Sequence, residues 1–315
     1  MKFVICIPTL NAGKFAAELA SAIDSQSVRA MRVLVVDSSS DDSSADVFRA
    51  HGAEIQTIPR RDFDHGGTRQ SAVDALDDSA DIVVFLTQDA VLADDAALAN
   101  LLAAFHDETV AAAYGRQLPR PGAGVAEAHA RLFNYPAESR IKALADAREL
   151  GIKTPFLSNS FAAYRISVLR RVGGFPRCTL FGEDMETAGK LLLAGYRLAY
   201  VAEARVWHSH AYTWRDELKR YFDIGVFHAR NQWIREHFGG AGREGLSYIR
   251  SEIAYAISRE PWAIPSLVVR NALKLLGMQL GLREAALPLG VKLRLTSNPR
   301  YWTHENRAER RTAVS

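Results

Sequence analysis

The sequence predicts an α/β protein with a Rossmann-like, mainly parallel sheet flanked by helices and a helical C-terminal extension. Short apolar runs typical of strands alternate with helical patterns over residues 1–115, and from Trp214 onward helical patterns predominate. The run 82–86, Ile-Val-Val-Phe-Leu, is apolar throughout. Such a run is typical of a strand that is buried on both faces of a parallel sheet.

Five strands, with helices between them, are expected in the first 115 residues. The first helix carries Phe15, Leu19 and Ile23 at a spacing of four, which places them on one apolar side. The expected strands are 3–7, 32–36, 54–58, 82–86 and 110–114. Regular alternation of strand and helix implies a parallel sheet with helices on both faces.

The pattern changes after residue 115, and the middle part, 116–212, mixes short strands with helices. A Pro- and Gly-rich loop at 119–124 precedes a stretch with a helical pattern over 125–150. The expected elements after it are strands at 161–164, 198–201 and 205–207 and a helix over 183–194.

The C-terminal part, 213–315, is expected to hold helices over 214–238 and from the break at 239–242 to residue 257. The segment 265–294 then combines apolar residues such as Leu267, Val268 and Leu275 with basic ones such as Arg270 and Lys274. Its composition predicts an amphipathic helix that either lies on a membrane surface or packs on the catalytic domain with its arginines in solvent.

The composition is that of a globular protein, with 48% hydrophobic and 24% charged residues. A net charge of +3 is too small to indicate nucleic acid, and basic residues do not alternate with aromatic ones as on a single-strand binding surface. We therefore expect no nucleic-acid partner.

The two cysteines, Cys6 and Cys178, indicate neither a disulfide framework nor a thiolate metal site, which fits a reducing compartment. The N-terminal apolar run 3–7 stops at Pro8 and is too short for a signal sequence or a membrane span. We expect a cytoplasmic protein, with peripheral contact to the cytoplasmic face of the inner membrane if 265–294 binds lipid.

Polar segments follow the first, second and fourth expected strands, at the edge where open α/β sheets bind ligands. They are 5–11 (ICIPTLN), 35–42 (VVDSSSDD) and 85–90 (FLTQDA), with the block 64–70 (DHGGTRQ) before the last of them. In this order they resemble the nucleotide-sugar half of the family-2 glycosyltransferases with the GT-A fold. Farther along, FGED at 181–184 and VWH at 206–208 resemble that family's catalytic-base segment and late histidine. The resemblance, over about residues 1–240, implies a nucleotide-sugar-binding half at 1–115 and an acceptor-side half at 116–212.

For the nucleoside, the resemblance implies Pro8, Thr9 and Asn11 after the first strand and Asp37 after the second. An Asp can accept a hydrogen bond from the N3–H of a pyrimidine. Asp37 could instead be a turn residue ahead of the serines that follow it.

For the diphosphate, the family pattern Asp-X-Asp becomes Thr87-Gln88-Asp89 in this chain. Loss of the first carboxylate leaves Asp89 as the acidic ligand of Mg²⁺ or Mn²⁺, with the diphosphate and water as further ligands. The resemblance implies His208 as a second ligand, with His210 as an alternative, although a histidine at a strand end is more often a structural residue. Gln88 is expected on the donor side.

The block that contains Gly66 and Arg69 is expected to bind the diphosphate as well. The Arg69 guanidinium could pair with phosphate oxygens, and Gly66 would let the backbone approach the ligand near a helix N-terminus. The block 62–69 (DFDHGGTR), together with Thr-Gln-Asp, resembles a bacterial rhamnosyltransferase subgroup. That resemblance implies dTDP-L-rhamnose as the donor.

For the catalytic base, the resemblance implies Asp184, which would take the proton of the acceptor hydroxyl and allow inversion at the anomeric carbon. Glu183 would bind the acceptor or orient Asp184, and the start of a helix favours negative charge at both positions. One of the two could serve only as a helix cap. Asn159 and Ser160 are expected to bind acceptor hydroxyls.

The sequence thus predicts an inverting, metal-dependent glycosyltransferase that moves L-rhamnose onto a lipid-linked saccharide in bacterial surface-polysaccharide assembly. One alternative is a transferase that uses a UDP-hexose, because uracil and thymine present the same N3–H edge. Another is a catalytically silent nucleotide-sugar-binding subunit, against which Arg69, Asp89 and Asp184 argue together. A dinucleotide oxidoreductase is disfavoured, since no Gly-X-Gly-X-X-Gly follows the first strand.

Overall fold

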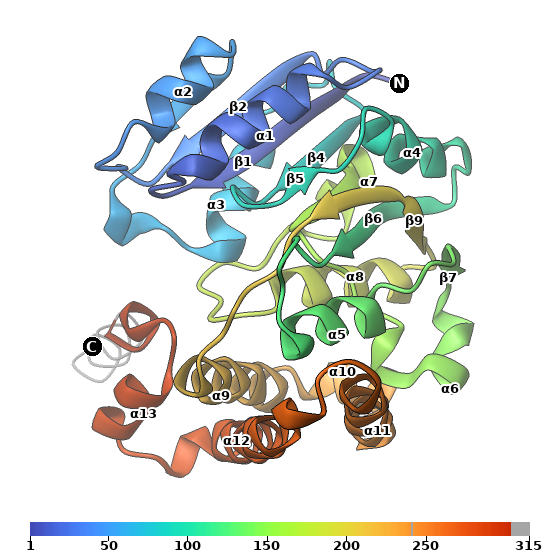
Figure 1. The fold of residues 1–315 in the computed structure, drawn as a ribbon. Coiled ribbons are helices and arrows are strands. Elements are labelled where there is room, and N and C mark those ends of the chain that lie inside the picture. The colour runs from blue at the N-terminus through green and yellow to red at the C-terminus, as the bar shows by residue number, and fades with distance from the viewer. Residues whose placement is uncertain (241, 304–315) are drawn as a thin grey trace, which may run out of the picture.

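The computed structural model describes residues 1–240 and 242–303, which form one mixed sheet with helices around it (Figure 1). The strand order is β3-β2-β1-β4-β8-β6-β9-β5, and β7 pairs with β9. The strands are β1 (Phe3–Thr9), β2 (Arg32–Asp37), β3 (Glu54–Thr57), β4 (Ile82–Leu86), β5 (Val91–Leu92), β6 (Val110–Leu118), β7 (Arg140–Lys142), β8 (Phe161–Arg165) and β9 (Arg197–Trp207). The predicted α/β class is confirmed.

The helices lie on both faces of the sheet and, for the C-terminal ones, below it in Figure 1. They are α1 (Lys14–Asp24), α2 (Ser44–Ala50), α3 (His65–Asp74), α4 (Ala97–Ala103), α5 (Val125–Asn134), α6 (Ala147–Leu150), α7 (Ile166–Arg171), α8 (Glu183–Leu193), α9 (Trp214–Arg230), α10 (Gln232–Phe238), α11 (Gly242–Arg259), α12 (Ile264–Leu282) and α13 (Leu289–Leu295). The helical C-terminal region is therefore present as predicted.

Strand direction brings several polar segments to one edge of the sheet. Strands β1 to β4 are parallel, β8 enters antiparallel between β4 and β6, and β9 runs parallel to β6. The carboxyl ends of β1, β2, β4, β6 and β9 and the amino end of β8 consequently share this edge. The apolar run of β4 is fully buried, with one apolar core on each face of the sheet.

Two predictions for the middle part are wrong. The helix expected over 125–150 ends at Asn134, because Pro136 disfavours helical backbone at the residue before it. The two short strands expected at 198–201 and 205–207 form one strand, β9, which passes a register shift against β6. An added Cβ at Gly115 in β6 would lie 2.4 Å from the carbonyl oxygen of Ala204, so this irregularity requires glycine.

The helix expected over 214–238 is divided at Asn231 into α9 and α10, and the expected break at 239–242 separates α10 from α11, with residue 241 outside the described residues. Helix α9 packs closely on α12 through glycines. An added Cβ at Gly277 would lie 2.4 Å from the carbonyl oxygen of Leu218, and one at Gly281 would lie 2.1 Å from that of Phe222. Backbone-to-backbone contact of this kind fixes how α9 and α12 face each other.

The segment 265–294 was expected to form an amphipathic helix. In the structure, the side of α12 that faces the protein carries basic residues, and the outer side carries apolar ones. Arg270 and Lys274 point inward and Leu267 is buried, whereas Val268 and Leu275 are exposed. Among the described residues, no helix has the length and apolar character needed to cross a membrane.

Candidate active site

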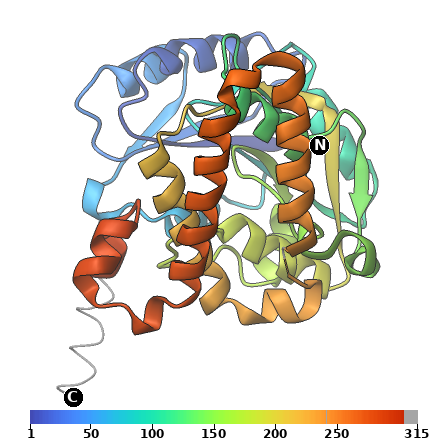
Figure 2. The ribbon, with the colours of Figure 1, turned by 60° about the horizontal axis from the view of Figure 1, so that its bottom comes forward.

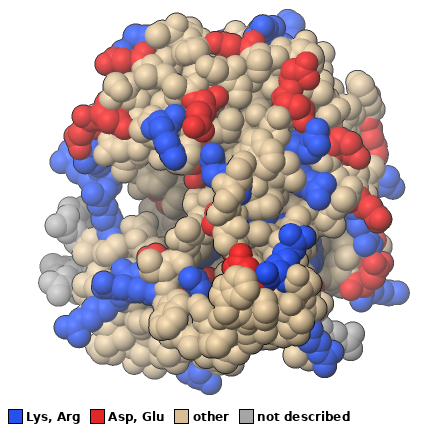
Figure 3. All heavy atoms as spheres, viewed as in Figure 1, with Lys and Arg blue, Asp and Glu red and all other residues tan. Residues whose placement is uncertain are grey.

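A cleft of about 820 Å³ opens at the carboxyl edge of the sheet, and residues of α9 and α12 form part of its wall. Figure 3 shows a hollow between the upper part of the molecule, which holds the sheet, and the lower helices. The predicted site residues that line the cleft are Arg69, Asp89, Asn159, Ser160, Glu183, Asp184 and His208. Those that do not line it are Pro8, Thr9, Asn11, Asp37, Gly66 and Gln88.

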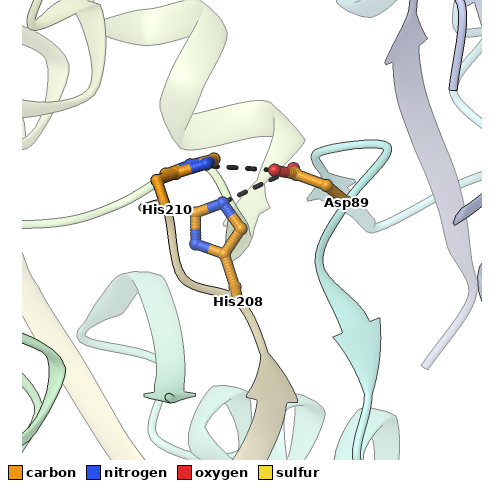
Figure 4. A group of neighbouring side chains, drawn as sticks. All are labelled: Asp89, His208 and His210. Carbon is orange, nitrogen blue, oxygen red and sulfur yellow. Dashed lines mark ion pairs between the residues drawn. The ribbon is translucent and has the colours of Figure 1, made fainter. Parts of the chain in front are cut away.

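Asp89, His208 and His210 form a group that could hold a metal ion (Figure 4). Asp89 follows β4 and the two histidines follow β9, so the shared strand direction brings them together. Nε2 of His208 lies 3.4 Å from Oδ1 of Asp89, and Nε2 of His210 lies 3.7 Å from Oδ2. The three ligand atoms all lie within 4.8 Å of one another.

Gln117, at the end of β6, determines which nitrogen of His208 faces Asp89. Its Oε1 lies 2.9 Å from Nδ1 of His208, so Nδ1 carries the hydrogen and Nε2 has a free lone pair. Burial lowers the pKa of His208, which favours the neutral ring. Burial also raises the pKa of Asp89, but the hydrogen bond and charge of His208 and the charge of His210 outweigh it, so the net shift is downward.

Above the lowered pKa of His208 its ring is neutral, so His208 and the ionised Asp89 then place two acceptors opposite each other. A cation between them would be bound by both, and a carboxylate with two imidazole nitrogens is a donor set that divalent metal ions use. These residues fit a divalent ion.

Glu183 and Asp184, the first residues of α8, form a pair of carboxylates that also lines the cleft. Glu183 is held by Arg69, whose Nη1 lies 3.2 Å from Oε1, and by the Asn159 side-chain amide at 3.1 Å. The Tyr164 hydroxyl donates to Oδ1 of Asn159 at 2.7 Å. Burial raises the pKa of Glu183, but the charges of Arg69 and His65 lower it more, so its pKa lies below the ordinary range.

Asp184 is in a different state from its neighbour. Its carboxylate accepts hydrogen bonds from the backbone N–H of Asn159 at 3.3 Å and of Met185 at 2.8 Å. Burial and the negative charge of Glu183 raise the pKa of Asp184 to about 7. Two adjacent carboxylates with pKa values moved in opposite directions are typical of a site where one holds a fixed charge and the other exchanges a proton.

The block 64–70 contacts the loop before α8, the helix that begins with the acid pair. The Asp64 carboxylate accepts from the backbone N–H of Gly67 at 2.6 Å, as the N-cap of α3, and from those of Cys178 and Thr179 at 3.0 and 3.1 Å. An added Cβ at Gly66 would lie 1.8 Å from the carbonyl oxygen of Pro176. Gly66 therefore allows contact with the loop before α8, and Arg69, 4% exposed, also donates to the carbonyl of His65.

The predicted nucleoside residues lie beside the cleft at the ends of β1 and β2, where Thr9 and Asp37 are register partners. Asp37 is 3% exposed, and its carboxylate accepts from the backbone N–H and the hydroxyl of Ser40. Oδ1 of Asn11 accepts from the backbone N–H of Asp41 at 2.8 Å. Gln88 exchanges two hydrogen bonds with the backbone of Leu10. The serine turn and the loop after β1 are thus fixed to each other and to β4.

Sequence reasoning missed Arg220 on α9. Its guanidinium lies over the rings of Phe181 and Tyr212, 5.1 and 5.5 Å from their centroids, and donates to the Tyr212 hydroxyl. It forms no ion pair with an acid in residues 1–240 or 242–303. It lines the cleft together with the acid pair and the group of Asp89, His208 and His210. Burial is the main cause of the lowered pKa values of His65 and His210, and the charge of Arg220 contributes to both. Gln117 was missed as well, and only the paired strands β6 and β9 could have indicated it.

Solved structures with similar folds include a mannosyltransferase and the S. aureus protein TarS. A mannosyltransferase from Pyrobaculum calidifontis, in complex with GDP-Man and Mn²⁺, has a TM-score of 0.56 at 22% identity, over 96% of this chain and 83% of that one. Residues 1–349 of S. aureus TarS give a TM-score of 0.54 at 17% identity, over 90% and 91% of the two chains. At these identities the likeness supports the GT-A fold alone.

Closer relatives are found among curated proteins. The O-antigen chain rhamnosyltransferase RfbN of Salmonella typhimurium is 45% identical over 305 residues, which cover 96% of this chain and 97% of the relative. The O-antigen chain rhamnosyltransferase WbaN of Salmonella anatum is 44% identical over 303 residues, with 96% of both chains covered. A family model described as glycosyl transferase family 2 matches residues 4–173, more than half of the chain. The chain belongs to glycosyl transferase family 2.

Proposed function

We propose that this protein is an inverting rhamnosyltransferase that moves L-rhamnose from dTDP-L-rhamnose to a lipid-linked saccharide in bacterial surface-polysaccharide assembly. The observation that carries the proposal is the 45% identity to an O-antigen chain rhamnosyltransferase over 96% of the chain. The cleft supports it, because it combines a carboxylate suited to accept a proton with a divalent-metal donor set.

Asp184 is the proposed general base. A base with a pKa near the working pH is ionised in a large fraction of molecules and still binds a proton well. The Asp184 carboxylate would remove the proton of the acceptor hydroxyl as that oxygen attacks the anomeric carbon. The C–O bond to the diphosphate breaks on the opposite side, which inverts the configuration.

Glu183 and Arg69 are proposed to support the base. Because Glu183 stays ionised beside Asp184, it keeps the proton affinity of Asp184 high. Asn159 is 2% exposed and its amide is bound to Glu183 and Tyr164, so it acts through Glu183. Ser160, which is only half-buried in the cleft wall, is the residue of the two that we expect at the acceptor.

Asp89, His208 and His210 are proposed to hold the divalent ion, which would neutralise the departing diphosphate. Gln117 keeps Nε2 of His208 available to the ion. Two imidazole ligands favour Mn²⁺ over Mg²⁺, because Mg²⁺ prefers oxygen ligands and keeps several waters.

Arg220 is proposed as the cation that binds the diphosphate. Arg69 has its guanidinium buried against Glu183, whereas Arg220 lies in the wall of the cleft that Asp89, His208 and Asp184 also line. The diphosphate would lie in this cleft, beside the proposed metal ligands. A guanidinium there can donate two hydrogen bonds to phosphate oxygens.

The nucleoside is proposed to lie across the ends of β1 and β2, against Pro8, Thr9 and Asn11. Asp37 still has lone pairs for a pyrimidine N3–H, although Ser40 uses part of its carboxylate. Gln88 supports this site by its hydrogen bonds to Leu10.

The proposal is tested by transfer of labelled rhamnose from dTDP-L-rhamnose to lipid-linked oligosaccharides extracted from O-antigen-producing bacteria. We expect transfer by the wild type in the presence of Mn²⁺. Asp184→Asn should lower kcat by about 10² to 10⁴-fold and leave the donor Kd nearly unchanged, since it removes a base and keeps the side-chain shape. Glu186→Gln, two positions along α8, is the matched control and should retain activity. Full activity in Asp184→Asn would refute the base.

A further inference from the structure

Helix α12 presents apolar side chains to the outside and charged ones to the inside. Val268, Leu275 and Leu276 are 57%, 63% and 49% exposed. On the opposite side, Nη1 of Arg270 and Nζ of Lys274 lie 3.1 and 3.6 Å from the Glu217 carboxylate. A helix on the surface of a soluble protein has the reverse arrangement.

Buried ion pairs hold α12 in this orientation. Besides Glu217 of α9, the group includes Glu252 of α11, which lies 3.9 Å from Nζ of Lys274 and is fully buried. Ion pairs of this kind seldom add stability over apolar packing, because both partners lose their hydration. The orientation of α12 therefore suggests a second environment for its outer face.

The exposed apolar surface continues from α12 onto the neighbouring segments. Ile257, near the end of α11, is 61% exposed, and Trp262, in the turn between the helices, is 76% exposed. Figure 2 shows α11 and α12 side by side at the front of the molecule. We call the surface formed by Ile257, Trp262, Val268, Val269, Leu275 and Leu276 the α11–α12 face.

The charges near this face are mostly positive. Within the described residues from 213 on, eight arginines but only two acids, Asp216 and Glu236, are exposed. Arg250 and Arg259 lie on α11, and Arg283 directly follows α12. In Figure 3 the lower part of the molecule is largely tan, and the coloured groups beside it are mostly blue.

We propose that the α11–α12 face docks on an anionic lipid bilayer. Apolar side chains would enter the interface, arginines would meet anionic headgroups, and Trp262 would lie at the depth where tryptophan is enriched. The opposite side of α12 lines the cleft through Ser266, Leu267 and Arg270. If the proposed function holds, a lipid-linked acceptor would stay in the bilayer while its saccharide reaches the cleft from the other side of one helix.

The test is co-sedimentation of the full-length protein with vesicles of phosphatidylglycerol and phosphatidylethanolamine, and with vesicles of phosphatidylcholine alone. The wild type should bind the anionic vesicles and bind less at higher salt. A variant with Leu275→Glu and Leu276→Glu should bind them at least tenfold more weakly. Met31→Glu, at a position 46% exposed before β2, is the matched control and should bind as the wild type does.

Thermal unfolding and donor binding of each variant should match the wild type, since the changed positions are exposed and outside the cleft lining. Failure of vesicle binding would thus be distinct from failure of the proposed function. The proposal is overturned if the wild type stays in the supernatant with anionic vesicles or if the double variant binds as tightly. It is also overturned if the wild type is a dimer that binds no vesicles and the double variant is a monomer, which would assign the face to a second copy.

Discussion

Arg69 and Glu183 form a buried ion pair in the wall of the cleft, with Nη1 of Arg69 3.2 Å from Oε1 of Glu183. The two side chains are 4% and 9% exposed. The pair keeps a negative charge next to Asp184, the residue with the raised pKa. The state of the proposed base is therefore set by a neighbour that need not touch the substrate.

The ion pair predicts how activity depends on pH. Protonated Asp184 cannot act as a base, so kcat/KM should fall as the pH drops through its pKa of about 7. Glu183→Gln removes the neighbouring charge, which lowers the pKa of Asp184 and should move this fall in activity to lower pH. The measurement is the pH profile of rhamnose transfer.

The matched control for that profile is Glu186→Gln, which changes an acid on α8 that is paired with Lys190 at 2.7 Å. It should leave the profile in place. If kcat/KM falls at the same pH in Glu183→Gln as in the wild type, the electrostatic link between the two carboxylates is contradicted.

Gln117 is not one of the proposed metal ligands, but its hydrogen bond to His208 should affect metal binding. Gln117→Leu removes the acceptor for Nδ1–H of His208, so either ring nitrogen can carry the hydrogen, and Mn²⁺ affinity should fall by about 10 to 100-fold. Asp89→Ala should abolish the metal dependence of donor binding. Mn²⁺ titration followed by donor affinity measures both, with the exposed Gln232→Leu as control. Unchanged Mn²⁺ affinity in both site variants would place the ion elsewhere.

Arg220 predicts a loss of donor affinity. Arg220→Gln should weaken binding of dTDP and of the sugar nucleotide by about 10 to 100-fold, which corresponds to a lost charge-assisted hydrogen bond of about 1.5 to 3 kcal/mol. Free thymidine should bind equally well to both proteins, because it has no diphosphate. Arg215→Gln, an exposed position on the same helix, serves as control. Equal loss of thymidine affinity would indicate a packing role.

Gly66 predicts that the block 64–70 acts on the acid pair through the loop before α8. Gly66→Ala places a Cβ 1.8 Å from the Pro176 carbonyl oxygen, so the loop must move. We expect a loss of about 1 to 3 kcal/mol in unfolding free energy and a lower kcat. Gly245→Ala, where a Cβ meets nothing within 4 Å, should have neither effect. A Gly66→Ala variant with normal stability and normal kcat would show that Gly66 does not influence the acid pair.

The sequence was sufficient for the parts of the fold that depend on local pattern. The run 82–86 is β4 with the predicted bounds, and helix 183–194 agrees with α8 to within one residue. Asp89 and His208 were expected together from the resemblance to the family, and the parallel direction of β4 and β9 brings Nε2 of His208 to 3.4 Å from Oδ1 of Asp89. The end of a strand can be recognised from the local sequence. The parallel direction of the strands then brings residues that are far apart in the sequence to the same edge of the sheet.

The parts that could not be predicted depend on packing between distant segments. The inward side of α12 cannot be read from its composition, because the partners of Arg270 and Lys274 are on α9 and α11. Arg220 reaches the cleft because α9 is fixed against α12 at Gly277 and Gly281. Arg69 was expected at a phosphate, and only the fold shows that Glu183 lies beside it.

The most direct test of the proposed function is a comparison of donors. With Mn²⁺ and lipid-linked oligosaccharide, kcat/KM for dTDP-L-rhamnose should exceed that for UDP-glucose by at least about tenfold, or roughly 1.4 kcal/mol. A pocket that fits the methyl group of rhamnose would leave the additional hydroxyl of glucose unpaired. Transfer from UDP-glucose that equals or exceeds transfer from dTDP-L-rhamnose would contradict the rhamnosyltransferase assignment and leave the family assignment intact.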